Sequence, residues 1–179
     1  YTTTYFTVNS SNAVRLQVII DPPETEQPAK PPYDEPYLDG GKQTASITKT
    51  AGVMFKVRVN SVDRYWNKVA VAGTEVQLVS TDPYAQMPPK QGLINGTTEF
   101  WLYLVTASTD GWTITADDVG TTNLDSYTSP KIVVEPNTAE KLLVLVPNQY
   151  IVQGSPTGKD GVVQPQIAGV SFPVSVYSV

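Results

Sequence analysis

The stretch AGVMFKVRVNSV, residues 51–62, alternates apolar and polar side chains from Phe55 onward. A period of two is typical of a β-strand with one buried face, because successive side chains of a strand point to opposite faces. The predicted inward side chains are Phe55, Val57 and Val59, and the predicted outward ones are Lys56, Arg58 and Asn60. The stretch therefore predicts a half-buried strand, which needs a second layer to cover its apolar face.

Further strand-like segments follow at residues 74–79, 98–105, 111–116, 130–136 and 140–147. Clusters of Gly, Asn, Asp and Pro separate them, and such clusters mark turns. No segment of eight or more residues has the periodicity of a helix. The fold class predicted is all-β, most simply a sandwich. The side chains expected in its core are Phe55, Val57, Val59, Val76, Leu78, Phe100, Leu102, Leu104, Trp112 and Ile114.

The composition excludes several classes of function. The chain has no cysteine and no histidine, which removes thiol nucleophiles, Cys-based metal sites and hydrolases of the Ser–His type. Its 12 Lys and Arg against 17 Asp and Glu give a formal charge of −5, which argues against nucleic acid as the main partner. No stretch approaches 18 apolar residues, so no membrane span is predicted. Few Lys, many Thr and Tyr and no Cys indicate an extracellular or cell-surface protein.

The chain repeats part of itself. Residues 127–146 match residues 1–20 at a constant offset of 126, and residues 168–179 match residues 51–62 at an offset of 117. The second block keeps the inward residues of the strand, as Phe172, Val174 and Val176. Two collinear blocks of this kind predict a window of a tandem array with a period of about 117 to 126 residues.

The repeat divides the chain into three expected parts. Residues 1–12 would be the last strand of a preceding unit, residues 13–137 a complete unit with a proline-rich acidic insertion at 21–43, and residues 138–179 the first strands of a following unit. The chain opens at Tyr1 without a signal peptide, as expected of a mature or excised chain. The apolar strands near its end have no partner sheet within it, so other units of the array or a neighbouring subunit are expected to cover them.

One family resemblance rests on AGVMFKVRVNSVDRYWNKVAVAGTEVQLVSTD, residues 51–82. A valine-rich strand, a turn with Asp63 and Asn67, and the sequence VAG followed by VQL resemble the bacterial immunoglobulin-like tandem repeats of large surface proteins of the invasin and intimin type. STDGWTITADD, residues 108–118, is similar to a later strand of those repeats. The resemblance implies an immunoglobulin-like β-sandwich, with one complete unit flanked by strands of its neighbours.

Calcium is the cofactor for which the sequence offers candidates. The insertion carries carboxylates that could bind Ca²⁺ between units, since Ca²⁺ takes six to eight oxygen ligands. No calcium-loop spacing is present, so a solvated, charged loop without any cofactor is the alternative that we favour. The candidate ligands are Asp21, Glu24, Asp34 and Glu35.

Two other kinds of site have candidates. Asn9 and Asn95 each begin a glycosylation sequon, although Asn95-Gly96 is also an ordinary turn pair. Trp66 and Trp101 could stack on a glycan, whereas such aromatics more often fill a core and its rims. The four polar residues expected at strand ends are interpreted as turn residues that bind the backbone, not as paired catalytic acids. They are Asp63, Asn67, Asp117 and Asp118.

The sequence thus favours a non-enzymatic structural protein of the cell surface, whose tandem units build a stalk, a sheath or an extracellular filament. The expected partners are neighbouring units in the same chain or adjacent subunits of a fibre. A carbohydrate-binding or adhesive module, with polysaccharide as partner, is the alternative from a different class. An accessory domain of an exported enzyme is a third possibility.

Overall fold

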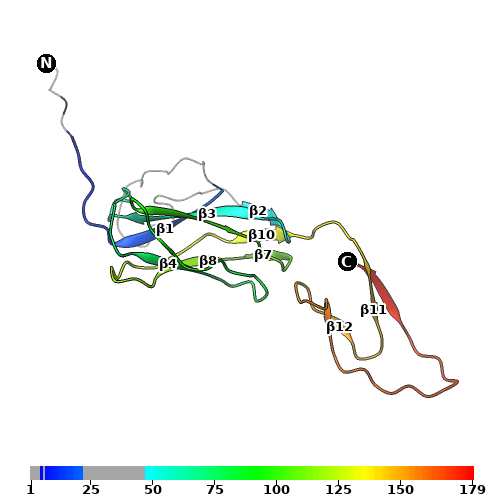
Figure 1. Ribbon diagram of the computed structural model, residues 1–179. Helices are drawn as coiled ribbons and strands as arrows, with labels where there is room; N and C mark the ends of the chain where they lie inside the picture. Colours follow the sequence, from blue (N-terminus) through cyan, green and yellow to red (C-terminus); the bar gives the residue numbers. More distant parts are fainter. Residues whose placement is uncertain (1–4, 6, 22–46) are drawn as a thin grey trace.

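The computed structural model describes residues 5, 7–21 and 47–179. Within this part all regular elements are β-strands, as predicted, and no helix occurs (Figure 1). The strands are β1 (Arg15–Ile20), β2 (Ile47–Thr50), β3 (Phe55–Val62), β4 (Glu75–Ser80), β5 (Gln91–Gly92), β6 (Thr97–Leu102), β7 (Ser108–Trp112), β8 (Ile114–Asp118), β9 (Tyr127–Thr128), β10 (Ile132–Glu135), β11 (Leu142–Leu145), β12 (Tyr150–Ile151), β13 (Lys159–Asp160) and β14 (Ser175–Ser178).

Strands β1 to β10 form a two-layer β-sandwich. One layer has the order β1-β3-β6. The other consists of β5-β4-β8-β9 and β2-β10-β7, which continue into each other because only Thr113 separates β7 from β8. Strand β2 pairs with β10 in parallel, and the remaining strand pairs of the described residues are antiparallel.

The core lies between these two layers. Nine of the ten predicted core side chains are buried in it, together with others from β1, β2, β8 and β10. Trp112 differs, because its ring is half-buried at the border of the core while its indole Nε1 donates a hydrogen bond of 2.7 Å to the carbonyl oxygen of Thr106. An indole N–H needs such a partner, which holds this ring at the rim.

The outward face of β3 is more covered than its alternation predicts. Lys56 and Arg58 are half-buried, whereas Asn60, predicted to face solvent, is buried. Its side-chain amide donates to Oε1 of Gln17 on the neighbouring strand β1, at 2.9 Å. A polar side chain can be buried at low cost when it has such a partner. The alternation of the sequence therefore predicted correctly which residues share a face of β3, but it did not predict that part of the outward face is buried as well.

Residues 139–179 follow the sandwich as a separate strand pair, β11 with β14, and a hairpin, β12 with β13 (Figure 1). The pairing register repeats that of β1 with β3. Leu16 lies opposite Ser61 and Val18 opposite Val59, while Leu142 lies opposite Ser178 and Val144 opposite Val176. Adding 126 to a residue number on β1 and 117 to its partner's number on β3 gives the corresponding pair on β11 and β14.

Hydrogen bonds beside these strands repeat with the same two offsets. The Val14 N–H donates to the Val62 oxygen, and the Glu140 N–H donates to the Val179 oxygen. A turn is also repeated, since the Val53 N–H binds Thr50 and the Val170 N–H binds Ile167, each at 3.1 Å. Gly52 and Gly169 hold positive φ angles of 74° and 81° within these turns, a conformation that glycine adopts without strain.

Candidate functional site

The calcium candidates are divided between described and undescribed residues. Asp21 has a positive φ of 53°, and its carboxylate forms an ion pair with Lys49. Glu24, Asp34 and Glu35 lie outside the described residues. Within the described residues no group of three or more carboxylates is placed to hold a metal ion. The calcium site therefore stays a prediction, and its one described candidate is engaged with a lysine.

The two tryptophans proposed for glycan stacking lie in different environments. Trp66 is 8% exposed, with the ring of Tyr127 edge-on at 5.4 Å and the Arg15 guanidinium 5.1 Å from its centroid. A ring enclosed in this way offers no face to a sugar. Trp101 on β6 is 56% exposed, with the Lys56 ammonium 5.3 Å from its ring centroid. Of the two, Trp101 is the one that can still contact a glycan.

The two sequon asparagines are both exposed. Asn95 and Gly96 have positive φ angles of 52° and 77°, and the backbones of Ile94 and Thr97 exchange hydrogen bonds of 2.9 and 3.2 Å across them. This is a two-residue hairpin turn, for which Asn-Gly is the favoured sequence. The turn role expected of Asn95-Gly96 is confirmed, and glycosylation at Asn9 or Asn95 stays a prediction.

The carboxylate of Asp63 holds the turn after β3 and fastens the segment that enters the sandwich. It accepts backbone N–H bonds from Tyr65 and Asn67 at 2.8 and 2.9 Å, and one from Ser11 at 2.9 Å. Burial alone would raise the pKa of Asp63, but the side-chain amide of Asn67 and these backbone donors outweigh it and lower the pKa below its usual value.

Asp118 has a similar role at the same end of the sandwich. It accepts bonds from the backbone N–H groups of Gly120 and Leu124 and from the Thr122 hydroxyl, between 2.6 and 3.0 Å. Desolvation raises its pKa and these donors lower it, with a net lowering. The turn interpretation of Asp63 and Asp118 is thus confirmed. Asp117 lies within β8 opposite Gln77 instead of at the strand end.

A third carboxylate of this type, Asp82, lies at the opposite end and was missed by the sequence reasoning. It accepts the backbone N–H groups of Tyr84, Val105 and Thr106 and the Thr106 hydroxyl, between 2.6 and 3.1 Å. Burial would raise its pKa, but the Thr106 hydroxyl and the N–H donors lower it overall. The sequence Thr81-Asp82-Pro83, an Asp before a turn-forming proline, was the available signal.

The three aspartates share one structural role. Each carboxylate accepts several hydrogen bonds, which for Asp63 and Asp82 include N–H groups from distant segments, and the pKa of each is lowered. Their geometry fixes loops at the two ends of the sandwich. Those ends are where the chain enters before β1 and leaves after β10.

The exit end forms a joint with the following segment. A Cβ placed on Gly154 would lie 2.2 Å from the Thr106 hydroxyl, so the two backbones approach closely there. A groove of about 470 Å³ lies beside this contact. Its lining comes from both sides of the joint and includes Ala51, Val105, Pro136, Ile151 and Tyr177. Because Asp82 binds the Thr106 backbone, it orients the surface on which the following segment rests.

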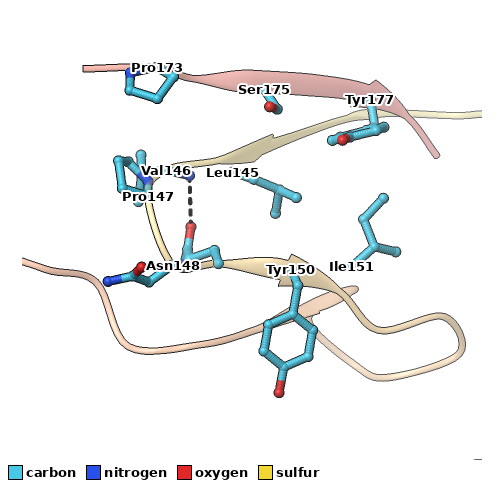
Figure 2. A pocket seen from close by; sticks show the side chains of 10 residues that line it. Leu145, Val146, Pro147, Asn148, Tyr150, Ile151, Pro173, Ser175 and Tyr177 are labelled. Atoms are coloured by element: carbon cyan, nitrogen blue, oxygen red, sulfur yellow. Dashed lines mark hydrogen bonds between the residues drawn. The ribbon is translucent and has the colours of Figure 1, made fainter. Parts of the chain in front are cut away.

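The β11–β14 pair carries an exposed apolar face. Val176 is 57% exposed and Leu142 71%, whereas Val59 and Leu16, at the corresponding register positions of β3 and β1, are both 0% exposed. The opposite face of the pair is covered by the β12–β13 hairpin. Figure 2 shows Leu145 and Ile151 directed into the space between β11 and β12, with Leu145 buried. The face that corresponds to the sandwich core is the more exposed of the two, because on the other face Leu145 is buried while Ser175 and Tyr177 remain exposed.

No helix of the described residues is long and apolar enough to cross a membrane. Comparison of the chain with protein-family models, with curated proteins and with solved structures found no match.

Proposed function

We propose that this chain is a non-enzymatic structural protein of the cell surface, in which immunoglobulin-like sandwiches follow one another to build a stalk, a sheath or an extracellular filament. Its partners are neighbouring units of the same kind. Two largely antiparallel layers that enclose one core support this arrangement of the unit.

The observation that carries the proposal is the repeated register of β1–β3 and β11–β14. Strand sequences are degenerate, so two similar strands can arise by chance. Register is a stricter criterion, because a slip of one residue would move every side chain to the other face. Here the same offsets of 126 and 117 relate the sequences, the pairings, the flanking hydrogen bonds and the glycine turn. Residues 139–179 are therefore best explained as the beginning of a second unit.

The direction of the chain favours end-to-end stacking. It enters the sandwich beside Asp63 and leaves after β10 at the opposite end, where Asp82 and Thr106 form the joint (Figure 1). Units connected in this way extend along one axis, and each contributes its own core. The aspartates act as loop anchors at both ends, which suits a mechanical role.

Electron microscopy of native material that contains this chain tests the proposal. Strands of eight to ten residues imply sandwiches about 30 to 40 Å long. We expect fibres or a sheath with an axial repeat of that order or a small multiple of it. Isolated particles with no ordered repeat would overturn the filament role.

One observation favours the second candidate, a carbohydrate-binding module. Trp101 presents an exposed ring on β6, and exposed aromatic rings are the usual platform for sugars. Retention of the chain on an insoluble polysaccharide, lost in Trp101→Ala but kept in Trp66→Phe, would support that function. Absence of retention would leave the structural role as the better account.

A further inference from the structure

A second contact, besides the covalent linker, joins the sandwich to residues 139–179. The linker after β10, residues 136–139, is exposed along its whole length. One exposed connection leaves two units free to rotate, and relative motion is the default for units that share a small interface. The β12–β13 hairpin adds the second contact, because the loop at its tip reaches Thr106 at the exit end of the sandwich (Figure 1). Two points of attachment can fix an orientation that one point cannot.

The Thr106 side of this contact is held in place by the sandwich. The Thr106 N–H and hydroxyl donate to the Asp82 carboxylate at 3.1 and 2.6 Å. The Thr106 carbonyl oxygen accepts the indole N–H of Trp112 at 2.7 Å. The hydroxyl therefore cannot rotate away from the hairpin without losing its hydrogen bond to Asp82. Thr106 is a fixed platform, because its backbone polar groups and its hydroxyl are all engaged.

The tip of the hairpin is shaped by its own hydrogen bonds and by a glycine. The Ser155 hydroxyl donates to the Val152 oxygen at 2.9 Å, and the Gly158 N–H donates to the Ser155 oxygen at 3.1 Å. Gly154 has a positive φ of 75°. A Cβ in its place would lie 2.2 Å from Oγ1 and 3.1 Å from Cα of Thr106. Only a residue without a side chain allows the two backbones to approach so closely.

The hairpin is in turn fastened to β11, so its tip moves together with the following segment. The Lys159 ammonium donates to the Val144 oxygen at 2.9 Å. The Gln149 N–H donates to the Val146 oxygen at 3.0 Å, and Oε1 of Gln149 accepts the Val146 N–H at 3.2 Å. A displacement of Gly154 is therefore passed on to the β11–β14 pair.

The tip belongs to the part of the second copy that does not match the first. It falls between the two matching blocks, in the interval between residues 146 and 168. The difference between the offsets of 126 and 117 makes the second copy nine residues shorter in this interval. The strands that repeat are those of the core, whereas the residues that form the joint are specific to this unit.

We propose that the β12–β13 hairpin is a brace, which fixes the orientation of the following unit relative to the sandwich through the contact of Gly154 with Thr106. This inference rests on the proposed equivalence of the two units. It deepens the proposed function by naming the contact that makes end-to-end stacking rigid. A side chain at position 154 must displace one unit against the other, until the Cβ lies not 2.2 Å but at least 3.4 Å from Thr106.

Two spin labels on the full chain measure this orientation. The chain has no cysteine, so Val79→Cys on β4 and Val176→Cys on β14, both at exposed residues, place one label on each side of the joint. Pulsed electron double resonance should then give a single narrow distribution of distances between the labels. Adding Gly154→Ala should shift the mean of this distribution and broaden it.

Gly158→Ala is the matched control. Gly158 lies in the same hairpin with a φ of 71°, close to the 75° of Gly154, so the two substitutions cause similar backbone strain. A Cβ at Gly158 would meet only the Leu143 side chain, at 3.7 Å, and would not touch the sandwich. Gly158→Ala should therefore leave the distance distribution unchanged. In the wild type, an NOE between the Hα protons of Gly154 and the Hβ of Thr106 tests the contact without any substitution.

Several outcomes would overturn the brace. They are a broad distribution in the wild type, absence of the NOE, an unchanged distribution in Gly154→Ala, or an equal change in Gly158→Ala. Failure of the proposed function has a different signature. Native fibres with the expected repeat, together with a broad distribution in the wild-type chain, would refute the brace while leaving the structural function standing. Isolated native particles, together with a narrow distribution, would refute the filament role while leaving the brace standing.

Discussion

The carboxylate of Asp82 offers the sharpest test of how the exit end of the sandwich is held. Its four donors are three backbone N–H groups and one hydroxyl, all within 3.1 Å. In Asp82→Asn the side chain keeps one acceptor oxygen and gains an NH₂ group. In either orientation at least one backbone N–H then faces another donor. A buried donor left without a partner costs about 1–3 kcal/mol, and hydrogen bonds to charged groups contribute about 1.5–3 kcal/mol.

We therefore expect Asp82→Asn to lower the free energy of unfolding by about 2 to 3 kcal/mol at pH 7. Urea titration followed by tryptophan fluorescence measures it, and Trp112 reports directly because it binds the Thr106 oxygen. The matched control is Asp110→Asn, which removes the same charge from an exposed site and should change stability by less than about 0.5 kcal/mol.

The pH dependence follows from the direction of the pKa shift. The pKa of Asp82 is lowered by folding, so its contribution is fully present above the unfolded value, about 3.9, and is lost as pH falls through the lower folded value. The difference in stability between the wild type and Asp82→Asn should therefore shrink below about pH 4. An effect equal to that of Asp110→Asn, or one that is unchanged at low pH, would refute the reasoning.

Three further variants test the core, a turn and the alternative function. Leu16→Ala should lower the free energy of unfolding by about 2–5 kcal/mol, because Leu16 is fully buried. Leu142→Ala should lower it by less than about 0.5 kcal/mol, because Leu142 is exposed. Equal losses of stability in urea titrations would contradict this difference in burial. Gly96→Ala should destabilise the protein by more than about 1 kcal/mol, because the φ of Gly96 is positive and the new Cβ would lie 2.3 Å from the Val69 oxygen. Gly92→Ala, whose new Cβ would have no atom nearer than 3.9 Å, should lower the melting temperature less. Neither the wild type nor Trp101→Ala should be retained on polysaccharide columns, and retention of the wild type alone would favour the glycan-binding role.

The sequence predicted the buried positions of a strand correctly where only one face of that strand is apolar. Alternation placed Phe55, Val57 and Val59 correctly, because a period of two reflects burial on one side. It did not predict the burial of Asn60, since a polar side chain with a hydrogen-bond partner leaves no apolar signal. Phe172, Val174 and Val176 match the inward residues of β3, yet the strand in the structure begins only at Ser175, after Pro173. A proline has no backbone N–H to donate to the neighbouring strand, and strand propensities of single residues do not account fully for this loss.

The candidate site was less predictable than the fold. Asp63 and Asp118 were recognised as turn residues, whereas Asp82 was not, because its donors Val105 and Thr106 come from a distant part of the chain. Trp66 and Trp101 looked equivalent in sequence, yet only packing against Arg15 and Tyr127 encloses the first. The open face of β11–β14 was anticipated from the repeat, since the offsets of 126 and 117 already related both strands to the first unit.

The central claim, that residues 139–179 begin a second copy of the sandwich, is tested most directly by cross-strand NOEs in the full chain. Residues opposite each other in a non-hydrogen-bonded pair bring their Cα atoms to about 4.5 Å and give strong Hα–Hα contacts. The account predicts such contacts for Leu142 with Ser178 and for Val144 with Val176, matching Leu16 with Ser61 and Val18 with Val59. Contacts shifted by even one residue, or absent between β11 and β14, would contradict it.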